Sequence, residues 1–383
     1  MLLKTIFFAS IILVAYIYVG YPLFVYLMAR KKDLIVEKES ELPVVSILIS
    51  AFNEEKSIEA TIRNKIALDY PRDKIEVIVV SDGSTDRTDT IVEKLADTSD
   101  IPIKLFRQPR KGKSAGLNLI VAEASGEIIV FSDANSIYTK NAVKSLAMNF
   151  SDPSVGYVTG KMVYTNADGS LIGDGCSSYM RYENWIRDKE TRLGSIVGVD
   201  GGIDAMRRSL YETLREDQLP DFVQPLKVIE KGYRVIYEPE AVIKEEVLGE
   251  SDDEYAMRVR VALRALWALK DMKSLLNPRK FGIFAFQLLS HKLLRYLAYI
   301  PILTVFITNI ALLGEGWFYV STLVLQLLFY FLAWEGRRSE DQGKVPVYLA
   351  LPYYFTLINI ACLTASLRFI RGDKLIIWKP RMG

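Results

Sequence analysis

The chain has 383 residues, half of them hydrophobic, and its 48 basic and 46 acidic residues leave a formal net charge of +2. This length exceeds that of one ordinary compact core. The balanced charge, without a long basic stripe, excludes nucleic acid as an expected partner. The two cysteines, Cys176 and Cys362, lie far apart in the sequence and indicate neither a metal site nor a disulfide framework.

The chain begins with an apolar segment. Residues 5–28 carry no charged side chain, and a helix of this length can cross a bilayer core of ~30 Å. The basic cluster Arg30-Lys31-Lys32 follows almost directly, which favours an uncleaved anchor over a signal peptide. By the positive-inside tendency, the domain that follows lies in the cytoplasm. We therefore expect an integral protein of the cell membrane, anchored through residues 1–32 and in contact with membrane lipids.

Short β-branched runs then alternate with amphipathic stretches. Strands are expected at residues 45–50, 75–81, 103–106 and 128–132. Crossover helices are expected between them at residues 54–67, 85–95 and 114–123. This order predicts a doubly wound α/β layer with a mainly parallel central sheet. The pattern loosens into a mixed segment at about 150–247, and we assign residues 33–275 to one domain.

The last part of the chain, residues 276–383, is again apolar. Residues 281–295 mix apolar and basic side chains, as an interfacial helix does, and include His291, the only histidine. Three further segments are long enough to span a membrane: residues 296–313, 317–334 and 345–367. The number of spans and the side of the C-terminus stay open, because either topology places basic residues outside. Pro352 makes the last segment an uncertain span.

Polar side chains stand at the ends of the expected strands. Asn53 and Glu54 follow the first strand, Asp82 closes the second, and Asp133 and Asn135 follow the fourth. Ligands of open α/β sheets bind at the carboxyl ends of the strands. A carboxylate with a second oxygen ligand two residues later suits a hard divalent cation and a diphosphate. The pattern therefore predicts an enzyme that acts on a nucleotide-activated substrate.

A basic turn opens the third of these helices. Lys111-Gly-Lys113 precedes the helical stretch that contains Asn118. The N-terminus of a helix favours negative charge, so Lys113 and this helix end together form a candidate anion site.

Four ordered motifs carry a resemblance to a known family. They are Ala51-Phe-Asn-Glu-Glu55, Val80-Ser-Asp-Gly-Ser-Thr-Asp86, Lys111-Gly-Lys113 with Asn118, and Ser132-Asp-Ala-Asn135. In order and spacing they resemble the family 2 inverting glycosyltransferases. The apolar C-terminal third resembles the membrane-integrated branch, which includes the synthases of cellulose, hyaluronan and poly-N-acetylglucosamine. The resemblance implies a GT-A fold, hexosyltransferase activity, a nucleotide-diphosphate-sugar donor such as a UDP-sugar, and Mg²⁺ or Mn²⁺.

The resemblance also implies roles for single residues. Nucleotide contacts fall on Asp82 and on Glu54 or its neighbour Asn53. The metal motif falls on Asp133 and Asn135, where the family usually has a second acid in place of the asparagine. These assignments come from the matching motifs alone.

The catalytic base of the family precedes a helix that ends in Gly-Tyr-Arg-Val. This register points to Asp221, with Asp217 as a competitor, because Gly232-Tyr-Arg-Val235 ends the expected helix. A glycine turn on the acceptor side falls on Gly202 and Asp204.

A donor-side arginine of the processive branch falls on Arg260, or on Arg264 if the register is four residues later. With Lys113, either arginine would neutralise the leaving diphosphate. A solvated or lipid-facing role is an equal alternative for this pair. Glu183 and Glu190 lie on one face of an expected helix. We interpret this face as solvated or salt-bridged; the alternative is that it lines the groove for the acceptor.

The expected activity is metal-dependent transfer of a sugar, with inversion, to a polysaccharide or lipid-linked acceptor. Two alternatives stay open: transfer of a single sugar to a polyprenyl or other lipid carrier, and a catalytically silent membrane-anchored binder of nucleotide sugars. The sequence does not name the sugar, the linkage or the acceptor.

Overall fold

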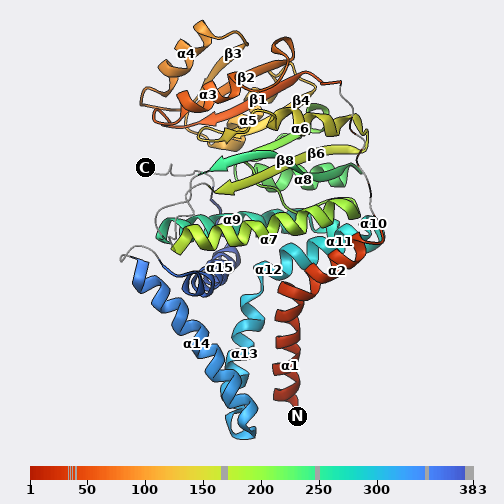
Figure 1. Cartoon of the computed structure of the whole chain (residues 1–383), viewed down its shortest axis with the longest axis vertical. Coiled ribbons are helices and arrows are strands. Elements are labelled where there is room, and N and C mark those ends of the chain that lie inside the picture. Colours follow the sequence, from red (N-terminus) through yellow and green to blue (C-terminus); the bar gives the residue numbers. More distant parts are fainter. Residues whose placement is uncertain are drawn as a thin grey trace. The chain divides into compact units, whose positions relative to one another are not determined.

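The computed structural model describes residues 1–32, 34, 36, 38, 41–164, 171–245, 251–340 and 345–375, with the backbone alone for 171–175 (Figure 1). The chain divides into two compact units. Unit 1 consists of residues 1–31, 164–186 and 246–373, and unit 2 of residues 32–163, 187–245 and 374–383. The sequence placed 164–186 and 246–275 in the same domain as the sheet, whereas these residues group with the apolar helices.

Unit 2 is built on one eight-stranded sheet with the order β3-β2-β1-β4-β7-β6-β8-β5. Its strands are β1 (Val45–Ala51), β2 (Ile75–Asp82), β3 (Ile103–Gln108), β4 (Ile128–Asp133), β5 (Ile137–Tyr138), β6 (Val155–Tyr164), β7 (Ile203–Arg207) and β8 (Arg234–Glu245). The four strands expected from the sequence are all present within two residues of their expected ends.

The sheet changes character across its width. β1 pairs in parallel with both β2 and β4, and β2 pairs in parallel with β3. Beyond β4 the described pairings are antiparallel, β4 with β7, β7 with β6, and β5 with β8. The expected mainly parallel sheet is therefore found in one half only. The βαβ repeat that enforces parallel pairing ends at β4, and the later strands return without such crossovers.

Five α-helices accompany the sheet in unit 2: α3 (Ile58–Ile66), α4 (Thr88–Thr98), α5 (Lys113–Val121), α6 (Ala142–Ala147) and α8 (Pro220–Glu230). Single helical turns add η2 (Arg72–Lys74), η3 (Met148–Ser151) and η4 (Arg208–Leu210). The crossover helices α3 and α4 begin three to four residues later than the sequence predicted, because the residues before them form loops that bond to one another.

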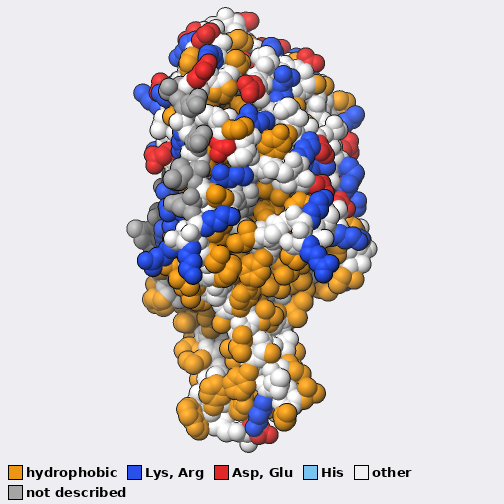
Figure 2. Space-filling view, turned by 90° about the vertical axis from the view of Figure 1, so that its right-hand side faces the viewer, with side chains coloured by type: hydrophobic (Ala, Val, Ile, Leu, Met, Phe, Trp, Pro, Cys, Tyr) orange, Lys and Arg blue, Asp and Glu red, His pale blue; other side chains and the backbone are white. Residues whose placement is uncertain are grey.

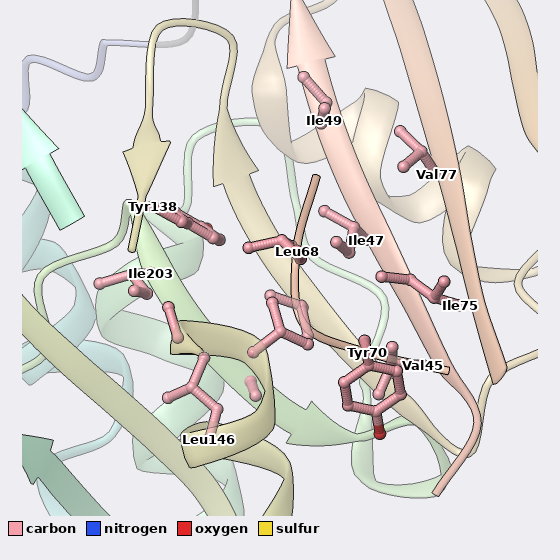
Figure 3. Close-up of a cluster of buried hydrophobic side chains, with 14 of the residues drawn as sticks. Val45, Ile47, Ile49, Leu68, Tyr70, Ile75, Val77, Tyr138, Leu146 and Ile203 are labelled. Atoms are coloured by element: carbon pink, nitrogen blue, oxygen red, sulfur yellow. The ribbon is translucent and has the colours of Figure 1, made fainter. Parts of the chain in front are cut away.

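One large cluster of buried hydrophobic side chains in unit 2 packs on one face of the sheet (Figure 3). Ile47 and Ile49 of β1 point to the same face as Val77 of β2, and Tyr138 and Ile203 belong to the same buried cluster. β2 is buried along its whole length, which is typical of a central parallel strand covered on both faces. Each fully buried side chain of this size contributes ~1.5–3 kcal/mol to stability. This packing fixes the strand ends from which the candidate site is built.

Unit 1 is helical. Its longer helices are α1 (Leu2–Ala15), α2 (Tyr21–Ala29), α9 (Ser251–Asp271), α13 (Tyr299–Ala311), α14 (Trp317–Ser339) and α15 (Val347–Ile370), together with most of α7 (Leu171–Leu193). Its shorter elements are η1 (Tyr16–Gly20), η5 (Lys273–Leu276), α10 (Pro278–Phe281), α11 (Ile283–Gln287), η6 (Leu288–Leu293), α12 (Leu294–Tyr296) and η7 (Leu313–Glu315). Within the unit, α15 packs against α9 and α14, and α1 packs against α13.

Among the described residues of unit 1, three helical segments are long and apolar enough to cross a membrane: Leu2–Ala29, Trp317–Ser339 and Val347–Ile370. A fourth span would combine Ile283–Tyr296 with Tyr299–Ala311, which meet at a bend of 55°. The surface over α1, α13 and α14 is predominantly hydrophobic (Figure 2). Pro352 lies inside α15 without ending it, so the segment that the sequence left uncertain is one continuous helix.

Candidate active site

Asp82 ends β2 and is almost completely buried, with 1% of its surface exposed. Its Oδ1 accepts hydrogen bonds from the backbone N–H of Lys111, at 2.8 Å, and from Gln108 Nε2, at 2.7 Å. The backbone N–H of Gly112 also donates to this carboxylate, and Arg110 completes the set with a salt bridge. Asp82 therefore ties the turn before α5 to the end of β2.

Arg110 has a second partner in the same place. Its guanidinium lies over the ring of Phe52, with 3.4 Å between Cζ and the ring centroid. A guanidinium stacked on an aromatic face presents a flat, positively charged surface. The residues around Asp82 thus combine a buried carboxylate with a cation at the carboxyl ends of β1 and β2.

The loops after β1 and β2 bond to each other. Asn53 adopts the left-handed conformation, with φ of 53°, and its Oδ1 accepts from the N–H of Thr85 at 2.8 Å. The N–H of Glu54 donates to Thr88 Oγ1 at 2.8 Å, and its carboxylate accepts from Ser57. Asn53 and Glu54 therefore shape the loop that follows β1, and their predicted nucleotide contacts stay predictions.

Lys113 joins two carboxylates from distant parts of the chain. Its Nζ lies 2.8 Å from Asp133 Oδ1, at the end of β4, and 3.5 Å from Asp221 Oδ1, in the first turn of α8. Burial alone would lower the pKa of Lys113, but the two carboxylates raise it above its ordinary value. The lysine is therefore charged at neutral pH. All three side chains keep some solvent exposure, from 25% for Asp221 to 41% for Asp133.

Asp221 is held against a glycine turn. A methyl group added to Gly201 would lie 2.5 Å from Asp221 Oδ2, and Gly201 has φ of +83°, which a side chain would strain. Pro220 occupies the first turn of α8 and leaves the start of the helix well defined. The carboxylate thus has one fixed wall at Gly201 and a lysine at its side.

Asp204 lies beneath the same turn and has no exposed surface. Its Oδ2 accepts from Tyr157 at 2.9 Å and from the N–H of Gly201 at 3.0 Å, and its Oδ1 accepts from Thr159. Burial raises the pKa of Asp204 to about 7; the hydrogen bond from Thr159 opposes this shift and the charge of Asp221 adds to it. Asp204 therefore supports the turn at Gly201. Because Asp204 is fully buried, its predicted role on the acceptor side would be to hold this turn in place.

The neighbouring Gly202 is also closely packed. A methyl group there would lie 3.0 Å from the side-chain ends of Glu245 and Ile243, so a larger residue would require these side chains to shift. Its carbonyl accepts a hydrogen bond from Tyr138 at 2.7 Å.

Asp217, the competitor for the base, lies in the loop before α8. It accepts from Arg215 Nε at 3.0 Å and from Lys374 Nζ at 2.5 Å. Burial would raise the pKa of Asp217, but these two ion pairs lower it below its ordinary value. Asp217 is therefore bound into surface ion pairs, whereas Asp221 stands beside Lys113.

The residues that the metal motif predicts are accessible. Asn135 is exposed, and Asp133 precedes it at the end of β4. Among the described residues, no group of three His, Cys, Asp or Glu side chains could hold a metal by itself. Mg²⁺ is commonly bound through one or two carboxylates together with substrate phosphates. A carboxylate and an amide oxygen at a strand end fit this kind of site, with the diphosphate of a donor supplying further ligands.

Arg260 and Arg264 both lie on α9, which belongs to unit 1, and both are half-buried. Their predicted contact with a leaving diphosphate stays a prediction.

Several residues of the site were not found from the sequence. Gln108 and Arg110, which bind Asp82, and Tyr157 and Thr159, which bind Asp204, are the main ones. For Arg110 a signal was present, because it directly precedes Lys111-Gly-Lys113 and adds a third basic residue to that turn. Tyr157 and Thr159 lie in a strand where their polar groups carry no recognisable motif.

Comparison with known proteins identifies the domain that carries this site. Residues 46–215 match the family model described as glycosyl transferase family 2. This stretch is similar to a family 2 glycosyltransferase domain. It contains Asp82, Lys113, Asp133 and Asp204, whereas Asp221 lies just beyond the matched stretch.

Two relatives illustrate the similarity of the family 2 domain. The probable glycosyltransferase YdaM of Bacillus subtilis is 34% identical over 222 residues, which cover 55% of this chain and 52% of that protein. The poly-beta-1,6-N-acetyl-D-glucosamine synthase of Staphylococcus aureus is 28% identical over 274 residues, covering 68% of this chain and 63% of that protein. The matched stretches therefore span between half and two thirds of the length of these relatives.

A solved structure extends the likeness to nearly the whole chain. It is a mannosyltransferase from Pyrobaculum calidifontis in complex with GDP-Man and Mn²⁺, with a TM-score of 0.74 and 23% identity, covering 97% of this chain and 99% of that chain. The likeness concerns the fold. With the family 2 match, it confirms the GT-A fold that the sequence motifs implied.

Proposed function

We propose that the protein is a membrane-anchored inverting glycosyltransferase that uses a nucleotide-diphosphate sugar. The observation that carries this proposal is the position of Lys113 between Asp133 and Asp221. One carboxylate belongs to the predicted metal motif and the other to the predicted base, so a single lysine links the two halves of the expected chemistry. The anchor and the basic cluster at residues 30–32 favour a cytoplasmic family 2 domain.

In the proposed reaction, a hydroxyl oxygen of the acceptor attacks the anomeric carbon of the donor sugar. The bond between that carbon and the diphosphate oxygen breaks, and the nucleoside diphosphate leaves with the electron pair. Asp221 accepts the hydroxyl proton, since its carboxylate is partly exposed and fixed against Gly201. Lys113 offers its charge to the diphosphate while it keeps Asp221 oriented.

A divalent cation fits this arrangement. Asp133 and Asn135 would hold Mg²⁺ or Mn²⁺, and the bound ion would supply charge neutralisation to the leaving diphosphate. The nucleoside is proposed to bind beside Asp82 and the loop of Asn53 and Glu54. The stacked pair of Arg110 and Phe52 shapes this part of the site.

The proposal is tested by the release of nucleoside diphosphate. The purified full chain in detergent is incubated with UDP- and GDP-sugars and Mg²⁺ or Mn²⁺, with and without membrane lipid extract as a source of acceptor. Metal-dependent release with at least one donor is expected, and the Asp133→Ala protein, prepared in parallel, should release none. Nucleotide binding without release for every donor would instead favour a silent binder. The mass of the products separates addition of one sugar from extension of a polymer.

A further inference from the structure

A cavity of about 270 Å³ lies within unit 1, and its described lining residues include none of those assigned to the reaction above. Side chains from η1, α7, η6, α12 and α15 form its walls. Pockets for drug-sized ligands range from ~300 to 1,000 Å³, so this cavity suits a small group or the head of a larger molecule.

The charge of the cavity is one-sided. Among the described residues that line it, His291, Lys292 and Arg295 are basic and none is acidic. Tyrosine side chains, among them Tyr18 and Tyr182, add hydroxyl groups to the wall. Basic groups and hydroxyl donors together are the partners that phosphate oxygens require. The cavity is therefore suited to an anion.

The arginine is held in place from behind. Arg295 forms a salt bridge with Glu183 of α7, whose side chain is only 2% exposed, and His291 Nε2 lies 3.2 Å from the same carboxylate. Burial would raise the pKa of Glu183, but the charges of Arg295 and His291 lower it well below its ordinary value. Glu183 is therefore ionised and fixes the arginine. The sequence predicted a solvated or salt-bridged face for Glu183, and the salt bridge is present, although the side chain is buried. His291, for which an interfacial position was predicted, is buried as well.

Two aromatic rings complete the support of the cation. The guanidinium of Arg295 lies over the rings of Tyr179 and Tyr182, at 5.8 and 5.2 Å from their centroids. A side chain that is paired, stacked and only 14% exposed needs little ordering when a ligand arrives. This preorganisation distinguishes Arg295 from an ordinary surface arginine.

Much of the remaining wall is apolar and comes from a candidate span. Leu351, Phe355 and Ile358 of α15 face the cavity, and α15 is one of the three segments long and apolar enough to cross a membrane. A ligand bound here would contact basic groups on one side and apolar side chains of a candidate membrane span on the other. This combination matches an amphiphilic anion better than it matches a free sugar or a nucleotide.

We propose that this cavity binds the phosphate head group of a membrane lipid, with Arg295 and Lys292 as its cationic contacts, and that this lipid carries the acceptor of the transfer reaction. The second part rests on the proposed function, because only a transferase needs an acceptor. The first part does not, because binding of the lipid requires no donor sugar.

Binding of a polyprenyl monophosphate to the full chain in a maltoside detergent tests the site, with native mass spectrometry as the readout. The neutral polyprenol of the same length and inorganic phosphate are measured in parallel. Retention of the polyprenyl monophosphate, little retention of the polyprenol, and no competition by equimolar inorganic phosphate are expected. Equal retention of the polyprenol, or full competition by inorganic phosphate, would overturn the assignment to a lipid phosphate.

Three variants locate the binding. Lys292→Gln removes one cation. The double variant Glu183→Gln/Arg295→Gln removes both charges of the buried ion pair, and the two amide side chains can still form a hydrogen bond with each other. Each should weaken binding at least ~10-fold, because each removes charge-assisted hydrogen bonds to the phosphate. Arg338→Gln is the matched control, because Arg338 is a basic residue of the same unit that is 64% exposed and outside the cavity. Unchanged binding in both cavity variants would refute the site.

The two proposals fail separately. If the lipid binds but no donor yields nucleoside diphosphate, the site stands and the transferase proposal fails. If the protein is active but does not retain the polyprenyl monophosphate, the inference about the cavity fails alone. Added polyprenyl monophosphate should also increase nucleoside diphosphate release by the native chain more than by the Lys292→Gln variant. An equal response of the two proteins would contradict the role of this lipid as the acceptor carrier.

Discussion

Replacement of Asp221 by asparagine separates the chemistry from the architecture of the site. The Asp221 side chain packs so closely against Gly201 that a methyl group added to the glycine would lie 2.5 Å from Asp221 Oδ2. Asparagine has the same shape as aspartate, so it still fits in this space. It cannot accept the proton of an acceptor hydroxyl. General base catalysis contributes ~10²–10⁴ to rates, so turnover should fall by at least ~10², or about 2.7 kcal/mol of activation free energy.

The same substitution should leave donor binding nearly intact. Lys113 keeps its other partner, Asp133, at 2.8 Å, so the cation that meets the diphosphate stays in place. We expect the affinity for the nucleotide sugar to change by less than about threefold, or ~0.7 kcal/mol. Titration of the nucleotide sugar measures binding, and nucleoside diphosphate release under saturating donor measures turnover, so the two effects are read independently.

Asp217→Asn is the matched control for this experiment. It also converts an aspartate to asparagine, in the loop before α8, and it weakens the ion pairs with Arg215 and Lys374. Surface ion pairs contribute ~0–1 kcal/mol, so turnover should fall no more than about fivefold. If Asp217→Asn is inactive and Asp221→Asn keeps near-normal turnover, the assignment of the base and the reasoning from Lys113 are both wrong.

Three further outcomes are expected. Asp133→Ala should abolish turnover at any metal concentration, whereas Asn135→Asp should retain it and bind metal more tightly, because a carboxylate is the stronger ligand; near-normal turnover in the alanine variant would remove the metal motif. Arg110→Ala should weaken nucleotide binding by ~5-fold or more, and Arg107→Ala, an exposed arginine of the same strand region, should not; equal titration curves would refute the role of the stacked arginine. The pKa of Asp204 is raised to about 7 from an ordinary 3.8, so the folded protein holds this proton more tightly than the unfolded chain. Thermal stability should therefore fall as the pH rises from 5 to 8 and the folded protein loses the proton. Melting curves should show a weaker pH dependence for Asp204→Asn.

The elements around the site were predictable because the information is local. The strands that end at Asp82 and Asp133 are short runs rich in β-branched residues, and parallel pairing with β1 brings their carboxyl ends to one edge. Gly232, just beyond the end of α8 at Glu230, gave the register for Asp221. In each case a short window of sequence contains both the element and the polar residue that follows it.

The partners of these residues could not be predicted in the same way. In the sequence, Glu183 looks like part of a solvated or salt-bridged helix face, because its neighbours are polar, and nothing local indicates that it is buried. It is buried by His291 and Arg295, which are 108 and 112 residues away in the chain. Asp204 is likewise buried by Tyr157 and Thr159 of another strand. The periodicity of a helix or strand shows on which face of that element a residue lies. It does not show which other element packs over that face.

The charges around Lys113 give a physical reason to expect a divalent cation. One ammonium group stands between two carboxylates, so Lys113, Asp133 and Asp221 carry a net charge of −1. The buried Asp204 adds little further charge below its raised pKa of about 7. A nucleoside diphosphate brings at least two more negative charges into this place, and the lysine alone cannot balance them. A divalent cation at Asp133 would change the net charge of the three side chains to +1, so donor binding and metal binding should strengthen each other.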